Sequence, residues 1–315
     1  MNMANAFCGS WWLQGTHDGG SPKWRSVQDP PRHEINNNDE NDRSCYVMHH
    51  YLSKKRPIVL TWFAGGVDDH LSRTRKRRND VSSSAKPALV LVHGAWHKES
   101  MWNLLKTYLH NYDVHTLQNP SSAVVPPSEL GDLYADARTI RQKVESIDGP
   151  VVVVAHSYGG APTTEGLAGM EDKVKRILYL NAFMPDVGES LVKANAGLDW
   201  WWGTDIIDQG AYEMLHAERI FYSDFDPMAA EMAAADLSPH SVKSFEQEIT
   251  QAAWHTIPSS YVIGEQDHAV PKEAREFMAT RAEHVYRVDS GHSPFISQPD
   301  RVARFIHEEY LKVTS

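Results

Sequence analysis

The sequence predicts an α/β fold: a doubly wound, mostly parallel sheet with a helical cap inserted late in the sheet. Two observations predict it. From residue 86 onward, short apolar runs rich in β-branched residues alternate with amphipathic stretches, the pattern of strands buried on both faces and of the helices that cover them. The alternation is broken once, over residues 186–255, where helical stretches occur without a convincing strand.

The expected elements follow one another in regular order along the chain. Strands are predicted at residues 88–93, 113–118, 151–155, 176–183, 261–264 and 284–288. Helices are predicted near 99–110, 129–146, after 160, and near 272–282 and 300–312, with cap helices near 208–218, 227–236 and 239–253. The predicted domains are therefore a core of residues 86–185 and 256–315, a helical cap of residues 186–255, and an N-terminal extension of residues 1–85.

The extension is polar and weakly periodic, so we expect most of it to be flexible. The apolar run at 57–63 is the exception, because it could add a strand to a sheet edge. The basic cluster Arg73–Arg78 resembles a nuclear localisation signal, but a solvated charge run in a loose tail is the favoured interpretation.

Bulk composition narrows the class of protein. A net charge of −10 argues against a nucleic-acid binder, because no overall positive field would attract phosphates. The two cysteines do not make a disulfide framework, and no apolar run approaches the roughly 20 residues that span a bilayer. With no signal-peptide pattern at the start, these features predict a cytoplasmic protein with no membrane partner; a homodimer is compatible with them.

The strongest local motif is VVVVAHSYGG at residues 151–160. An apolar strand that turns sharply into a helix places a serine, here Ser157, at the tip of a strained turn, where it can act as a nucleophile. Ala155 stands where the pattern usually has its first glycine, and we expect the extra methyl group to be tolerated. The alternative is an ordinary turn after a buried strand.

The first strand ends in LVHGAWH, residues 91–97. A bend at Gly94 would let the backbone N–H of Ala95 join that of Tyr158 in an oxyanion hole; alternatively, Gly94 only turns the chain. His93 and His97 have a spacing that suggests metal ligands. They follow a strand, however, and no third ligand is evident, so we expect no metal and no cofactor.

The acid and base of a serine nucleophile should follow late strands, in the order nucleophile, acid, base. Asp267 follows the strand at 261–264, and His292 follows the last strand, so both fit this order. Asp267 could instead cap the next helix, and His292 could be an ordinary loop residue. Asp186 is the second candidate for the acid, and Glu265 is a weaker one.

Residues 88–312 resemble the small α/β-hydrolases that include plant salicylate-type methylesterases and hydroxynitrile lyases. The matching pieces are LVHGAWH, VVVVAHSYGG, AFMPD, ERIFYSDF, AAWHTIPSSYVIGEQDHAVP and DSGHSPFISQP. The resemblance implies the triad Ser157, Asp267 and His292, with the amides of Ala95 and Tyr158 as the oxyanion hole. The lyases carry threonine at the position of Gly94 and lysine at that of Ser293, so both departures favour hydrolysis.

Together these features predict a serine hydrolase that cleaves a small or medium apolar carboxylic ester or lactone through an acyl-enzyme. Expected substrate-binding residues are Trp96, His97, Trp201 and Trp254, although the tryptophan run at 200–202 could instead hold the cap onto the sheet. Two alternatives stay open: C–C bond hydrolysis or lyase chemistry on the same triad, and a non-catalytic small-molecule receptor with a hydrolase fold.

Overall fold

The computed structural model describes residues 86–194, 204–207 and 210–314 of the chain. Its centre is a sheet of six parallel strands in the order β2-β1-β3-β4-β8-β9. The strands are β1 (Ala88–Val92), β2 (Val114–Thr116), β3 (Val151–His156), β4 (Val174–Leu180), β8 (Ser259–Gly264) and β9 (His284–Val288). The chain builds the sheet outward to one edge, returns past β1 and continues to the other edge, so the doubly wound sheet is confirmed.

The sheet is covered on both faces, as the apolar strands require. All residues of β1 and β3 are buried. Along β1, Val90 and Val92 belong to one apolar cluster while Leu89 and Leu91 belong to the other, because successive side chains point to opposite faces.

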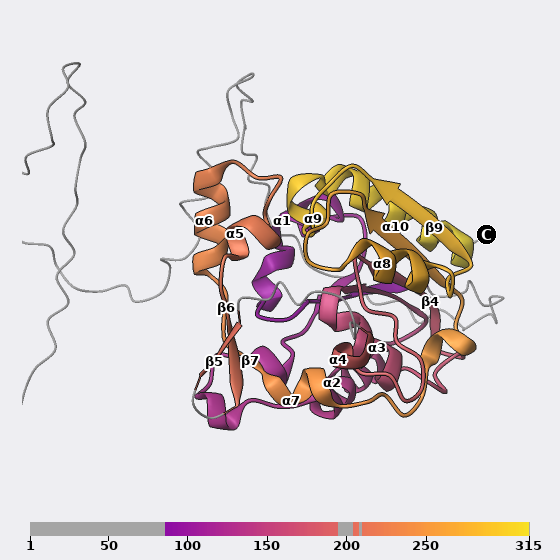
Figure 1. Ribbon diagram of the computed structural model, residues 1–315. Helices are drawn as coiled ribbons and strands as arrows, with labels where there is room; N and C mark the ends of the chain where they lie inside the picture. The colour runs from indigo at the N-terminus through magenta and orange to yellow at the C-terminus, as the bar shows by residue number, and fades with distance from the viewer. Residues whose placement is uncertain (1–85, 195–203, 208–209, 315) are drawn as a thin grey trace, which may run out of the picture. The chain divides into compact units, whose positions relative to one another are not determined.

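Each apolar cluster is completed by helices on its own face. The first cluster takes side chains from α2 (Leu133–Glu145), α3 (Gly160–Gly166) and α8 (Lys272–Ala279). The second takes them from α1 (Asn103–Tyr108), α9 (Pro294–Ser297) and α10 (Pro299–Thr314) (Figure 1). The helices therefore lie where the strand and helix alternation predicts them.

The inserted region contains short helices and also a small antiparallel sheet that the sequence did not predict. The helices are α4 (Leu191–Ala194), α5 (Ala217–Ile220), α6 (Pro227–Ala235) and α7 (Val242–Glu246), and the strands pair in the order β5 (Thr204–Ile207), β6 (Ala211–Met214), β7 (His240–Ser241). Figure 1 shows α5, α6 and the small sheet gathered together, in orange.

The expectation of uninterrupted cap helices at 208–218 and 239–253 is therefore wrong, whereas α6 confirms the helix at 227–236. The missed strands are two to four residues long, too short for a periodic signal. They are held by pairing across the chain, as between Tyr212 and His240, and sequence periodicity does not report such pairing.

Because the six strands of the large sheet are parallel, their carboxyl ends lie along one edge of it. The loop from Gly94 to Trp96 follows β1, Ser157 follows β3, Asn181 follows β4, Asp267 follows β8, and His292 follows β9. Segments distant in the sequence thus meet at one edge, where ligands bind in open α/β sheets.

Three expectations cannot be compared with this structure. The possible strand at 57–63, the basic cluster Arg73–Arg78 and Trp201 all lie outside the described residues. Among the helices of the described part, none combines the length and apolarity needed to cross a bilayer.

Candidate active site

Ser157 occupies the turn between β3 and α3 with a φ of 53°, a left-handed conformation that is unusual for a residue with a side chain. Two glycines permit this tight turn. A Cβ added at Gly159 would lie 2.4 Å from the carbonyl oxygen of His93, and one at Gly160 would lie 2.0 Å from that of Phe183. The motif therefore forms the strained turn that the sequence predicts.

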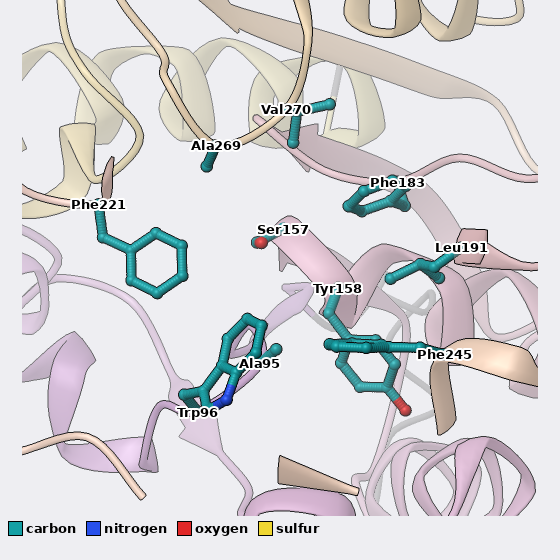
Figure 2. Close-up of a pocket in the computed structure, with 10 residues that line it drawn as sticks. All are labelled: Ala95, Trp96, Ser157, Tyr158, Phe183, Leu191, Phe221, Phe245, Ala269 and Val270. Atoms are coloured by element: carbon teal, nitrogen blue, oxygen red, sulfur yellow. The ribbon is translucent and has the colours of Figure 1, made fainter. Parts of the chain in front are cut away.

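Ser157 lies at the wall of a small pocket. Figure 2 shows the lining residues, which come from the core and the cap: Ala95, Trp96, Ser157, Tyr158, Phe183, Leu191, Phe221, Phe245, Ala269 and Val270. None of these lining residues carries a charge. The indole N–H of Trp96 donates to the Tyr212 carbonyl, and the Tyr158 hydroxyl points away from Ser157 toward Asp136. Among their side chains, the Ser157 hydroxyl is thus the one polar group without a partner elsewhere.

Asp267 and His292 are both buried and form a direct pair. The Nδ1–H of His292 donates to Asp267 Oδ2 at 3.0 Å. The other carboxylate oxygen accepts the backbone N–H groups of Ala269 at 2.6 Å and Val270 at 3.2 Å. The carboxylate therefore fixes the ring so that Nε2 carries the lone pair that a general base needs.

His292 Nε2 is buried and makes no hydrogen bond to any described residue, so the contact with the Ser157 hydroxyl is not formed here. The ring of His292 nevertheless packs 5.2 Å, between centroids, from that of Phe221, which lines the pocket together with Ser157. Catalytic hydrogen bonds are often long in enzymes without substrate and shorten in the complex. The structure brings Asp267 to His292 and places Ser157 in the adjoining pocket.

The rival acids have other partners. Asp186 lies 3.0 Å from the Nε2 of His255, and Glu265 pairs with Arg287 at 2.9 Å. Of the three carboxylates considered from the sequence, Asp267 is the one that contacts His292.

Ala95 and Tyr158, the expected oxyanion donors, both line the pocket with Ser157. The N–H of Ala95 makes no hydrogen bond within the described residues and so is free to donate to a ligand. Tyr158 is anchored by its hydroxyl, which donates to the buried carboxyl of Asp136 at 2.6 Å. Burial raises the pKa of Asp136 to about 7, since a desolvated carboxylate is costly. The Tyr158 side chain is thus held in place, and the N–H of Ala95 is available to a ligand.

Gly94 has no room for a side chain. A Cβ there would lie 2.8 Å from the Ser157 Cβ, 3.0 Å from His156 Nδ1 and 3.3 Å from the Ser157 hydroxyl oxygen. A side chain at this position would therefore collide with Ser157. The role of Gly94 goes beyond turning the chain, which was the alternative interpretation.

The two histidines beside Gly94 are fully used by other hydrogen bonds. His93 Nδ1–H donates to the Gly94 carbonyl, and its Nε2 accepts from the N–H of Asn119. His97 Nδ1–H donates to the Ala95 carbonyl, and its Nε2 accepts from the hydroxyl of Tyr222. Burial lowers the pKa of His93 to about 4 and that of His97 to about 3. Within the described ranges, no group of three or more His, Cys, Asp or Glu side chains is arranged so that it could hold a metal ion.

The pocket predictions have mixed outcomes. Trp96 lines the pocket, as expected. His97 is not part of the lining and packs behind Phe221, with 5.5 Å between ring centroids. Trp254 is not among the lining residues: its indole N–H donates to the Pro185 carbonyl, and Arg281 lies over its ring.

Three phenylalanines of the lining were missed: Phe183, Phe221 and Phe245. Phe183 is the third residue after the end of β4 and could have been found by its place at the carboxyl edge of the sheet. Phe221 and Phe245 come from the inserted region, where the sequence pattern did not predict the local structure correctly.

With this geometry established, comparison with known proteins defines the class. Residues 89–305 match the alpha/beta hydrolase family, and the chain belongs to that family. The protein named Probable hydrolase R7 from Phoma sp. is 31% identical over 240 residues, which cover 71% of this chain and 98% of that protein. Methylesterase 1 of Arabidopsis thaliana is 22% identical over 224 residues, covering 61% of this chain and 83% of its own length.

Solved structures agree on the fold. The crystal structure of polyneuridine aldehyde esterase matches with a TM-score of 0.61 at 19% identity, covering 73% of this chain and all of that one. The resemblance seen in the sequence motifs is thereby confirmed, and the protein is an enzyme of the hydrolase class.

Proposed function

We propose that this protein is a serine esterase that cleaves a small or medium apolar carboxylic ester or lactone through an acyl-enzyme on Ser157. The observation that carries the proposal is the buried pair of His292 and Asp267 beside a pocket whose one unpaired polar side chain is a strained serine. A serine hydroxyl is a weak nucleophile, and a neighbouring histidine oriented by a carboxylate activates it.

In the proposed acylation step, the Ser157 oxygen attacks the ester carbonyl carbon while His292 Nε2 takes the hydroxyl proton. Asp267 holds the ring and stabilises the imidazolium that forms. The carbonyl oxygen becomes an oxyanion, and the N–H groups of Ala95 and Tyr158 donate to it. The ester C–O bond then breaks, and the imidazolium gives its proton to the leaving alcohol. Water attacks the acyl-enzyme with His292 again as base, releasing the acid and restoring the serine.

The chemistry of the pocket supports an uncharged substrate. Burying a charged group against Phe183, Phe221 and Phe245 would cost several kcal/mol of desolvation energy without a compensating partner among the lining residues. We therefore expect the part of the substrate that enters the pocket to be apolar.

The test uses a fluorophosphonate probe, which labels activated serines, on the wild type and on Ser157→Ala. We expect the wild type to be labelled and the variant to be unlabelled. The matched control is Ser259→Ala: this serine is also buried, but it begins β8 at the opposite edge of the sheet, so its loss should leave labelling intact. Labelling that survives Ser157→Ala would refute the nucleophile.

The substrate class is tested with two p-nitrophenyl esters of equal acyl length, the butyrate and the negatively charged hemisuccinate. We expect a kcat/KM at least about 100-fold higher for the butyrate, since the uncompensated charge disfavours the transition state as well. Equal rates would contradict the apolar pocket. Probe labelling without ester turnover would favour a receptor, and carbon–carbon cleavage products would favour the lyase alternative.

A further inference from the structure

We infer that Asp224, in the cap, is a positioning residue that holds the loop carrying His292. The inference rests on the proposed role of His292 as the base. Asp224 lies between α5 and α6, 67 residues from Gly291 in the chain, yet its Oδ2 accepts the backbone N–H of Gly291 at 2.9 Å. Gly291 immediately precedes His292, so this hydrogen bond acts on the peptide that sets the direction of the histidine.

The contact between Asp224 and Gly291 is tight. A Cβ at Gly291 would lie 2.7 Å from Asp224 Oδ1 and 3.0 Å from the hydroxyl oxygen of Ser223. Asp224 Oδ1 is itself buried and has no hydrogen-bond partner among the described residues. Burying an unpaired acceptor costs stability, so global stability alone does not account for a carboxylate at this position.

The other anchors of the histidine loop come from the core. Asn181, after β4, donates from its side-chain amide to the carbonyls of Gly291 at 3.1 Å and His292 at 3.2 Å. His156, at the end of β3, donates from Nε2 to the His292 carbonyl at 3.0 Å. Side chains at the ends of sheet strands thus hold the carbonyl groups of the histidine loop. The N–H of Gly291, in contrast, is held by a side chain of the cap.

The same cap segment, Phe221–Asp224, also contacts the opposite wall of the site. The Tyr222 hydroxyl donates to His97 Nε2 at 3.0 Å, and His97 Nδ1–H donates to the Ala95 carbonyl at 2.7 Å. The ring of Phe221 packs between these two contacts, against His97 and His292. One segment of the cap thus contacts both the loop of the proposed base and the loop of a proposed oxyanion donor. A displacement of this segment would change the alignment of the base relative to the serine.

The test compares Asp224→Ala, Asp224→Asn and the neighbouring Asp226→Ala, each assayed for kcat and KM on p-nitrophenyl butyrate and for the rate of fluorophosphonate labelling. Asp224→Ala removes the acceptor, and we expect kcat and the labelling rate to fall about 10- to 100-fold, with KM changed less than about threefold. Asp224→Asn retains an oxygen that accepts the same N–H, so it should restore most of the rate.

Asp226→Ala is the matched control because this exposed carboxylate caps α6 by accepting the N–H of Met228 and has no hydrogen bond to the histidine loop in the described part of the chain. It should lower the melting temperature through the lost helix cap while leaving kcat near the wild-type value. A purely structural role for Asp224 would make the two alanine variants alike in activity at equal loss of melting temperature.

Gly291→Ala disturbs the same contact from the other side. We expect the Gly291→Ala, Asp224→Ala double variant to be no slower than the slower single variant, since both remove one interaction. Wild-type kcat in Asp224→Ala, failure of Asp224→Asn to restore the rate, or additive losses in the double variant would overturn the inference. Labelling that persists in Ser157→Ala would instead overturn the proposed function, so the two failures are distinguishable.

Discussion

Lowering the pH from 6.5 to 5 should destabilise this protein, because several histidines near the site are buried in the neutral form. The pKa of His93 falls to about 4 and that of His97 to about 3, and the pKa values of His156 and His240 lie well below the ordinary 6.5. Burial is the main cause in all four, since a desolvated imidazolium is unfavourable. The unfolded chain has no such restriction and binds protons from about pH 6.5 downward.

Proton linkage determines whether stability rises or falls with pH. A depressed pKa in the folded state gives stability that is complete above pH 6.5 and is lost as the pH falls toward the folded value. The loss approaches about 1.4 kcal/mol per pH unit for each histidine, or about 1.6 kcal/mol between pH 6.5 and 5, because the unfolded side chain is half protonated at pH 6.5. His93 and His97 together therefore cost about 3 kcal/mol over this range, and His156 and His240 act in the same direction.

Asp136 acts in the opposite direction. Because burial raises its pKa to about 7, the folded state keeps a proton that the unfolded state releases, and stability increases as the pH falls from 7 toward 4. This carboxyl offsets about 2 kcal/mol between pH 6.5 and 5. The histidines outweigh this offset, so the folded state should be less stable at pH 5 than at pH 6.5.

The assay is urea unfolding followed by tryptophan fluorescence at a series of pH values from 8 to 5. His93→Asn should reduce the slope of the unfolding free energy against pH by about one proton, and Asp136→Asn should steepen it by about one proton. An unfolding free energy that stays constant down to pH 5 would refute the reasoning. Equal slopes in the wild type and His93→Asn would do so as well.

Two further predictions concern the site itself. Gly94→Ala places a Cβ 2.8 Å from that of Ser157. We expect a stability loss of about 1–3 kcal/mol in thermal melts and at least about tenfold slower probe labelling. Labelling at the wild-type rate would contradict the close packing. Asp267→Asn should leave the fold intact and lower kcat on p-nitrophenyl butyrate about 10⁴-fold, because the amide favours the wrong tautomer of His292. A drop of less than about tenfold would show that another group orients the ring.

The six-stranded sheet was predictable because buried parallel strands appear as continuous apolar runs. Strand β3 is the clearest case, with every residue buried between strands β1 and β4. The cap sheet was not predictable for the opposite reason. Its strands are two to four residues long and depend on partners such as Tyr212 and His240, so no local pattern distinguishes them from helix or loop.

The pairing of Asp267 with His292 could be anticipated because both residues follow strands in the order that the fold allows. Pocket residues were harder, since an aromatic residue type does not reveal the direction of its side chain. Trp96 lines the pocket and Trp254 does not, although the residue type is the same. Asp224 gave no sequence signal, because its partner is a backbone N–H that any residue offers.

The surroundings of Ser157 contain several buried histidines, and the hydrogen bonds decide which one can act as its base. His93 and His97 each donate one ring N–H to a backbone carbonyl and accept at the other nitrogen, so neither has a free lone pair. His156 has a free lone pair at Nδ1, but its Nε2–H is used by the His292 carbonyl and no carboxylate contacts its ring to stabilise an added proton. His292 combines a free Nε2 with a carboxylate at Nδ1, and of these four rings it alone meets both requirements of a general base. The neutral histidines thus hold the loops of the proposed oxyanion donor and the proposed base without competing for the serine proton, and the burial that keeps them neutral is the cause of the expected acid sensitivity.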